Sequence, residues 1–310
     1  MHAIKIQNLT KRYGLNEVLK DVNILVNEGE FYCLMGPNGS GKTTLVSILA
    51  SIKEKTDGHI EIMGKSPQEA RGLIGYMPQE NFSSPFLTGK ENLIYFAGLL
   101  GYKGAHANKI VSELLEKVGL TEEANKLVSK YSGGMRKRLE LATILFDGIK
   151  VLILDEPTTG LDPTARRNFF DLVNKTRENN TTIFLITHIG SDAELADRVG
   201  LINNGRIIAE GSPIELKKNN NLKNVITIET SYKDEKIKRI LKTFSVEGSD
   251  VSSVIETESG YKIYLNDIAE DIPKIVNSLS SEGFTVTRLE SAIPTLEDVF
   301  FKLTGHSIKN

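Results

Sequence analysis

A glycine-rich run near the N-terminus, "GPNGSGKTT", has the residue types and spacing that can cradle a chain of phosphates. It fits G-x-x-x-x-G-K-[ST], follows the β-rich run "EGEFYCLM" and precedes the helical run "TTLVSILASI". Successive backbone N–H groups of such a loop point inward, and the following helix adds its positive N-terminal end. We therefore expect a phosphate-binding loop that consists of Gly36, Pro37, Asn38, Gly39, Ser40, Gly41, Lys42, Thr43 and Thr44.

Three side chains of this loop have individual expected roles. Lys42 would place its ammonium on the β- and γ-phosphates, and the Thr43 hydroxyl would hold magnesium. Thr44 is well placed for another phosphate oxygen. The alternative is an ordinary glycine turn, which the strand and helix on either side make the weaker interpretation.

Two adjacent acids, Asp155 and Glu156, follow the apolar run "VLIL", at the strand end where sites of parallel sheets form. Asp155 suits a water-mediated contact to magnesium, and Glu156 is free to polarise an attacking water as a general base. Another apolar strand, "TTIFLIT", leads into His188, which we expect to contact the γ-phosphate. The alternatives are a solvated strand end for the acids and a structural role for the histidine.

The run "YSGGM" indicates a second anion site. Ser132 is a natural N-cap for the helix that follows, and Gly133 and Gly134 leave the first N–H groups uncovered. Because the loop at 36–44 already supplies one phosphate cradle, this helix end is more useful to a nucleotide held by a second subunit. The alternative is a simple capped helix whose basic residues face water, namely Arg136, Lys137 and Arg138.

The composition limits the class of protein. A chain of 310 residues is long enough for two domains, and 40% hydrophobic and 25% charged residues are typical of a soluble globular protein. A net charge of −2 argues against nucleic-acid binding. The single cysteine, Cys33, cannot form an internal disulfide and predicts a reducing compartment. No run approaches the roughly 18 apolar residues of a membrane span.

The pattern of elements predicts two domains. The first, 1–218, should be an α/β domain with a helical subdomain at about 80–145 that lacks a coiled-coil arm. A late hairpin is expected at "NNGRIIAEGSP", and a linker or surface loop at "LKKNNNLKN". The second domain, 222–310, reads as strand, helix, strand, strand, helix, strand, which is the α+β plan called βαββαβ or ferredoxin-like. We expect it to serve dimer contact, regulation or support, with inert packing as the alternative.

Together, "GPNGSGKTT", Gln79 in "GYMPQE", "YSGGM", "LILDEP", "GLD" and His188 resemble, in this order and at these spacings, the nucleotide-binding subunit of an ABC transporter. The resemblance covers residues 1 to about 215 and implies a P-loop NTPase fold. The tail "PTLEDVFFKLTG" resembles the end of the ATPase subunits of ABC-2 type exporters of drugs, sodium or polysaccharide.

The resemblance implies an ATPase that uses ATP and Mg²⁺ and forms a head-to-tail homodimer. Each subunit would lend Ser132, Gly133 and Gly134 to the γ-phosphate held by its partner. The resemblance also implies that Tyr13 stacks on adenine and that Asp162 links the two sites. It implies that Gln79 contacts the magnesium site and marks the start of the helical region that meets the membrane partner. The family more often has "LSGGQ" where this chain has "YSGGM", but the Ser-Gly-Gly is intact.

The implied function is that of a peripheral subunit on the cytoplasmic face of the cell membrane. It would energise a separate integral membrane permease, for export, without a nucleic-acid partner. One alternative is a soluble ABC ATPase acting on ribosomes or nucleic acid, and another is a module that only senses nucleotide. The transported substrate has no signature in the sequence, because its contacts would lie in the permease.

Overall fold

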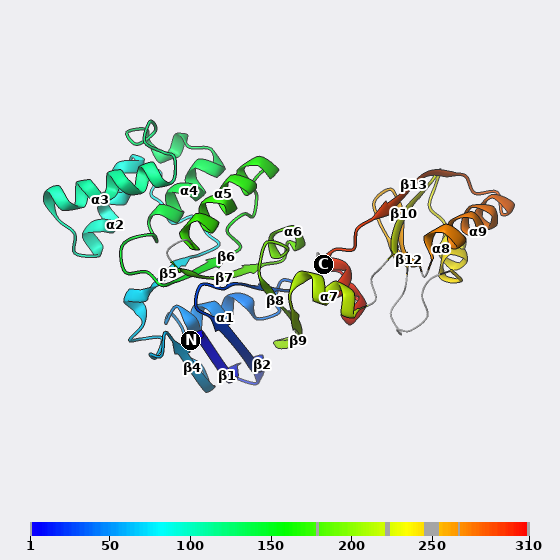
Figure 1. The fold of residues 1–310 in the computed structure, drawn as a ribbon, viewed down its shortest axis with the longest axis horizontal. Helices are drawn as coiled ribbons and strands as arrows, with labels where there is room; N and C mark the ends of the chain where they lie inside the picture. Colours follow the sequence, from blue (N-terminus) through cyan, green and yellow to red (C-terminus); the bar gives the residue numbers. More distant parts are fainter. Residues whose placement is uncertain (1, 178–179, 221–223, 245–253, 266, 309–310) are drawn as a thin grey trace.

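The computed structural model describes residues 2–177, 180–220, 224–244, 254–265 and 267–308. The described strands form three sheets of six, three and four strands. Figure 1 shows two units side by side. The first unit contains the six- and three-stranded sheets with most of the helices, and the second unit contains the four-stranded sheet with its own helices.

The six-stranded sheet is the frame of the first unit. Its order is β5-β6-β7-β3-β8-β9, and every neighbouring pair is parallel except β8 and β9. The runs "FYCLM", "VLILD" and "TIFLIT" are buried at every residue, because helices or the second sheet cover both faces. In chain order the strands are β3 (Phe31–Met35), β5 (Ile74–Met77), β6 (Val151–Asp155), β7 (Thr182–Thr187), β8 (Arg198–Asn203) and β9 (Arg206–Gly211).

A three-stranded antiparallel sheet covers one side of this frame. It consists of β2 (Asn16–Asn27), β1 (His2–Tyr13) and β4 (Asp57–Ile62), in that order. Buried and exposed side chains alternate along its strands, as expected for a sheet with one solvent-exposed face. Its apolar face packs on α1 (Lys42–Leu49) and encloses this helix against the six-stranded sheet. The helix that follows the phosphate-binding loop is therefore fixed between two sheets (Figure 1).

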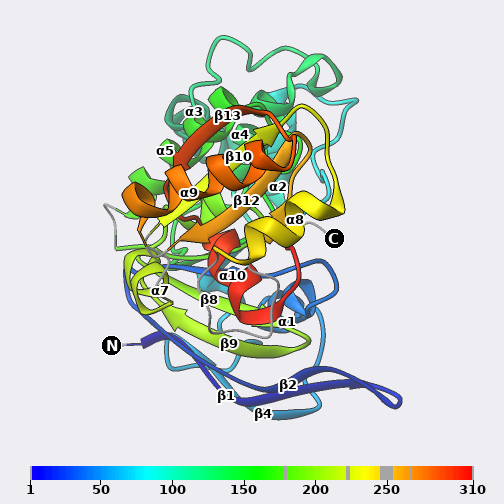
Figure 2. The ribbon, with the colours of Figure 1, turned by 90° about the vertical axis from the view of Figure 1, so that its right-hand side faces the viewer.

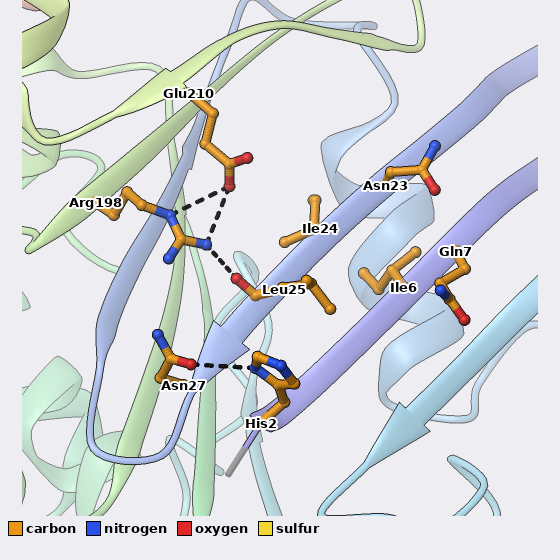
Figure 3. Close-up of a pocket in the computed structure, with 9 residues that line it drawn as sticks. All are labelled: His2, Ile6, Gln7, Asn23, Ile24, Leu25, Asn27, Arg198 and Glu210. Atoms are coloured by element: carbon orange, nitrogen blue, oxygen red, sulfur yellow. Dashed lines mark hydrogen bonds and ion pairs between the residues drawn. The ribbon is translucent and has the colours of Figure 1, made fainter.

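Arg198 joins the two sheets at one edge. Its guanidinium lies 2.8 Å from Glu30 and 3.2 Å from Glu210, donates to the carbonyl of Leu25 on β2, and lies over the Tyr32 ring. Figure 3 shows the contacts of Arg198 with Glu210 and Leu25, all of which line a hollow of about 450 Å³. No residue of the predicted phosphate-binding loop lines this hollow, so Arg198 is a structural cross-link between sheets.

Apart from α1, the helices of the first unit lie on the other side of the frame or project beyond it (Figure 1). The helical region has its own apolar core, to which α2, α3 and α4 contribute. Thr88 and Glu91 form a capping box at the start of α2. The bounds are α2 (Gly89–Leu99), α3 (Gly104–Lys117), α4 (Gly133–Ala142), α5 (Pro163–Thr176), α6 (Gly190–Ala193) and α7 (Pro213–Asn219), with 3₁₀ turns at Arg71–Leu73 and Val128–Lys130.

The second unit follows the predicted order of elements, β10 (Asn224–Thr230), α8 (Glu235–Lys242), β11 (Val254–Glu256), β12 (Gly260–Leu265), α9 (Ile268–Ser281) and β13 (Val286–Ala292). Its sheet is antiparallel throughout, in the order β11-β12-β10-β13. Both helices cover the face turned away from the first unit (Figures 1 and 2). The opposite face contributes Val225 and Tyr264 to the core of the first unit.

A last helix, α10 (Leu296–Thr304), returns to the first unit. Leu296, Val299 and Phe300 belong to the same core as strands β3, β6 and β7, and α10 lies against α6 and α7 (Figure 1). The predicted tail is therefore helical, but it packs on the first unit although it follows the second in sequence.

Local predictions fared differently. The hairpin at Gly205 is present between β8 and β9, with Asn204 and Gly205 both at positive φ, as a two-residue hairpin turn requires. In "LKKNNNLKN" the expected linker is wrong at its start, because α7 continues to Asn219 from a capping box at Ser212 and Glu215. The stretch 221–223 lies outside the described residues.

Candidate active site

Four adjacent strands bring the predicted chemistry to one edge. The phosphate-binding loop follows β3, His188 follows β7, Asp155 and Glu156 lie at the end of β6, and Gln79 comes two residues after β5. These strands are parallel neighbours in the order β5-β6-β7-β3, so their carboxyl ends meet. Residues far apart in sequence, such as Lys42 and Glu156, thus lie close together.

Glu156 is the centre of this edge. One carboxylate oxygen lies 3.7 Å from Lys42 Nζ, and the other lies 3.0 Å from His188 Nδ1 and accepts a 3.2 Å hydrogen bond from Gln79 Nε2. Its backbone has a φ of +47°, a region that costs a non-glycine residue roughly 1–3 kcal/mol. The fold therefore maintains a strained backbone to place this carboxylate among three predicted site residues.

The loop itself has the geometry of a phosphate cradle. Gly41 caps α1 with a φ of +104°, and Lys42 Nζ donates to the carbonyls of Gly36 and Pro37 at 2.8 and 2.9 Å. A Cβ on Gly36 would lie 2.3 Å from the Ile202 carbonyl, so the first glycine is required by the protein's own packing. Burial lowers the pKa of Lys42, an effect that Glu156 and Asp155 oppose.

A cavity of about 310 Å³ lies over this loop. Its lining includes Lys42, Thr43, Gln79 and Glu156 together with Val18, Asn38, Gly39, Gly41 and Thr44. The structure thus brings together much of the predicted loop and two of the predicted catalytic residues around one space. Ser40 is buried beneath, and its hydroxyl has no hydrogen-bond partner among the described residues.

Asp155 has the properties of a cation ligand. It is 1% exposed, and neither carboxylate oxygen has a hydrogen-bond partner in the part of the chain that the structure describes. Burial and, second, the charge of Glu156 raise its pKa to about 6, while Thr43, Lys42 and Tyr76 oppose the rise. A buried acid beside a threonine hydroxyl fits the hard oxygen ligands that Mg²⁺ prefers. Thr43 and Asp155 are the residues that would hold it.

The second predicted anion site is formed differently. Ser132 caps α4 and accepts from Met135 N at 3.2 Å, and Asp162 caps α5 by accepting from Thr164 N and Ala165 N at 2.9 Å. A Cβ on Gly134 would lie 2.9 Å from that of Ala165, so the two capped ends touch. Neither Ser132, Gly133, Gly134 nor Asp162 lines the cavity over the phosphate-binding loop.

Tyr13 also lies outside the lining of that cavity. It is 45% exposed at the end of β1, and the ammonium groups of Lys11 and Lys53 lie 4.9 and 5.6 Å from its ring centre. An exposed ring with positive charge nearby is free to stack on a flat ligand, so its adenine role stays a prediction.

The basic cluster does not face water as the alternative interpretation expected. Arg136 donates to the hydroxyl and carbonyl of Ser83, and Arg138 donates to the carbonyls of Val118 and Gly119. These bonds connect α4 to the segment that follows Gln79 and to the end of α3. Gln79 lines both the cavity over the loop and a second hollow beside Gly133.

Sequence reasoning missed the acid on which this network depends. Glu140 is fully buried on α4, lies 3.1 Å from Lys137 Nζ and accepts from Ser83 Oγ at 2.9 Å. The sequence signal that could have identified Glu140 as a buried partner is a glutamate within an apolar helical run next to basic residues. The unusual first position of "YSGGM" also has a structural reason, because Tyr131 donates to the Glu123 carbonyl and closes against Gly89.

Comparison with protein families gives two matches. Residues 19–159 match the family described as ABC transporter, and residues 211–304 match the family described as ATP-binding protein DrrA1-3-like, C-terminal domain. The first match lies within the first unit, and the second extends from α7 of the first unit through the second unit to α10.

Related proteins match over the whole length. The chain is 36% identical to the daunorubicin resistance ATP-binding protein DrrA2 of Streptomyces coeruleorubidus, over 100% of this chain and 97% of the relative. It is 31% identical to the linearmycin resistance ATP-binding protein LnrL of Bacillus subtilis, over 99% and 100%. Among solved structures, the dimeric post-hydrolysis state of the ATP-binding cassette MJ0796 bound to ADP and Pi is similar at 28% identity and a TM-score of 0.61, over 67% of this chain and 98% of that one.

Proposed function

Because the chain belongs to the DrrA-like ATP-binding proteins of ABC transporters, we propose that two copies close head to tail on two molecules of MgATP and drive a separate permease that exports a drug or antibiotic. The chain is the ATPase subunit of its transporter. Export of a drug is supported by the resistance names of relatives that match it from end to end.

The observation that carries the proposal is the convergence on Glu156. Lys42, Gln79 and His188 all approach its carboxylate within 3.7 Å at the mouth of the phosphate-binding cavity. A carboxylate in this place can accept a proton from a water that attacks the γ-phosphate. Lys42 binds the phosphates, while His188 and Gln79 orient the carboxylate and the groups around it.

Magnesium fits the same edge. Thr43 would hold the ion together with the carboxylate of Asp155, which accepts no hydrogen bond from the residues that the structure describes. When bound, the ion supplies positive charge beside the phosphate oxygens. Gln79 donates a hydrogen bond to Glu156 and so connects this site to the start of the helical region. We propose that the outer surface of the helical region contacts the permease.

A second copy is needed because the site is incomplete within one chain. The capped helix end at Ser132, Gly133 and Gly134 lies away from the cavity lining, and a head-to-tail partner would bring its own copy of that end to the γ-phosphate. The dimeric arrangement of the similar cassette supports this assembly. Asp162, whose helix touches α4, would then lie at the junction of the two sites.

The second unit we place in the ferredoxin-like class, with a supporting or regulatory role. Its element order and its sheet order of fourth, first, third and second strand support that class. No described helix combines the length and the apolar character needed to cross a membrane. We propose a peripheral position on the cytoplasmic face, reached through the permease.

Mixing two inactive variants tests the shared site. Lys42→Ala removes the phosphate lysine, and Ser132→Arg blocks the helix end. In a head-to-tail mixed dimer one of the two sites is built from unaltered halves, so the mixture should regain up to about a quarter of wild-type ATP hydrolysis. A mixture that stays as inactive as either variant alone would show that each chain completes its own site.

The permease is tested by capture from native membranes. The variant Glu156→Gln, held with MgATP, should retain an integral membrane protein after gentle solubilisation, and Lys42→Ala is the control that cannot hold nucleotide. Recovery of ribosomal or nucleic-acid material without a membrane protein would instead support the ribosome-associated alternative.

A further inference from the structure

The start of α10 meets the start of α6 through a hydrogen bond. Glu297 Oε1 accepts a 2.7 Å hydrogen bond from the backbone N–H of Gly190. Gly190 is the first residue of α6 and lies two residues after His188. The first turn of a helix leaves N–H groups without intrahelical partners, so a carboxylate there is stabilising. A residue of the last helix thus supports the turn that carries a predicted site residue.

Because Gly190 has no side chain, there is room beside it for the carboxylate of Glu297. A Cβ at Gly190 would lie 1.9 Å from Glu297 Oε2 and 2.2 Å from its Cδ. The φ of Gly190 is not positive, so its backbone alone does not demand glycine. The absence of a side chain is needed here for the approach of Glu297.

The rest of the turn is held from the other side. Ile189 N donates to the Thr187 hydroxyl at 2.9 Å, and the buried Asp192 accepts from the hydroxyl of Thr158, which lies two residues after Glu156. Arg166 approaches Asp192 at 3.6 Å. The N–H of Gly190, in contrast, is held by Glu297, a residue that follows the second unit in sequence.

The position of Glu297 is itself fixed. Its neighbour Asp298 is 3% exposed, lies 2.5 Å from Lys262 Nζ, accepts from Tyr264 OH at 2.9 Å and forms a capping box with Thr295. The apolar side of α10 lies in the core of the first unit. A carboxylate on such an anchored turn can hold an N–H group in place.

We propose that Glu297 is a positioning residue for His188, acting through the Gly190 N–H to fix the turn that presents the imidazole to Glu156. The proposal rests on the role assigned to His188 above. His188 Nδ1 lies 3.0 Å from Glu156, and a small shift of the turn would lengthen that approach. Misplacement by about 1 Å can cost up to about a hundredfold in rate.

The first test compares substitutions at Glu297 in the full-length chain. Glu297→Ala should lower kcat for ATP hydrolysis about tenfold while KM for ATP stays within about twofold. Glu297→Gln keeps an acceptor oxygen and should restore kcat to within about twofold of wild type. The matched control is Glu290→Ala, an exposed acid that lies 2.5 Å from Arg288. Equal loss in the Ala and Gln variants, or none in either, overturns the proposal.

A reciprocal test uses the space above Gly190. Gly190→Ala should lower kcat because the new Cβ displaces Glu297, but it should cause little further loss when Glu297 is already Ala. Losses that multiply in the double variant would show that the two residues act independently, which overturns the proposal.

A local readout separates positioning from general destabilisation. Hydrogen exchange of the amides in 187–193 should be faster in Glu297→Ala than in wild type, and unchanged in Glu290→Ala. His188→Ala completes the set. If it hydrolyses ATP normally, the role of His188 fails and this inference fails with it. If it is inactive while Glu297→Ala has normal kcat, the proposed function stands and the positioning role alone is wrong.

Discussion

Two pairs of adjacent acids differ in how the fold treats them. At the end of β6, neither oxygen of Asp155 has a hydrogen-bond partner among the described residues and its pKa is raised, while the backbone of Glu156 is in the left-handed region. Glu297 and Asp298 begin α10 with their oxygens bonded to a lysine, a tyrosine, a threonine and a backbone N–H. Burial is similar for Asp155 and Asp298, at 1% and 3% exposed. The difference fits the proposed roles, in which the first pair would hold a cation and act on a substrate, while the second pair joins parts of the protein.

The largest expected effect is on catalysis at the first pair. Glu156→Gln removes the proposed general base and should lower kcat about a thousandfold, measured as phosphate release at saturating MgATP. The same chemical change at Glu297 should stay within about twofold. Comparable losses at the two positions would remove the distinction between the pairs.

The next effect is on stability at the second pair. Asp298→Asn leaves the ammonium of Lys262, which is 19% exposed, without its counter-charge. We expect the free energy of unfolding to fall by about 3 kcal/mol, seen as a lower thermal midpoint by calorimetry. Glu290→Gln, on the exposed surface, is the control. An unchanged thermal midpoint for Asp298→Asn would show that Asp298 does not stabilise the packing of α10 against the second unit.

The matching substitution at the first pair should act in the opposite direction. Asp155→Asn removes a charge that burial and the nearby Glu156 disfavour, so it should raise the free energy of unfolding of the nucleotide-free chain by about 1 kcal/mol at neutral pH. Addition of MgATP should then stabilise wild type more than the variant. A variant that is less stable than wild type without nucleotide would contradict the unsatisfied state of Asp155.

The smallest effect is the pH dependence of that difference. The folded pKa of Asp155, about 6, lies above its ordinary value of 3.8, so the folded chain binds the proton more tightly. The charge therefore costs stability above about pH 6, and the cost disappears as pH falls toward 4. The gap in thermal midpoint between Asp155→Asn and wild type should shrink over that range. A gap that widens on acidification would reverse the sign of the shift.

The sequence was sufficient where chemistry needs consecutive residues. The run from Gly36 to Thr44 and the pair Asp155 and Glu156 each combine an apolar strand with polar residues at its end, so their places could be predicted. Their meeting at one edge followed from the rule for parallel sheets. The order of elements in the second unit was also predictable, because turns and periodicity separate them.

The sequence was insufficient where contacts join distant elements. Glu297 and Gly190 are 107 residues apart, and nothing in either local run indicates the other. The bonds of Arg136 and Arg138 to carbonyls of other segments have no sequence signal, because every residue type offers a carbonyl. The placement of α10 was missed for the same reason, since an amphipathic run does not specify the surface that it covers.

The return of α10 has a consequence for synthesis on the ribosome. Leu296, Val299 and Phe300 complete an apolar core whose other members, such as Phe31 and Leu152, are translated far earlier. The apolar surface of the first unit that α10 covers therefore stays exposed until the whole second unit has been translated. A nascent chain interrupted between the two would present exposed apolar surface to chaperones and proteases, so unfinished molecules would be recognisable before they could reach a transporter.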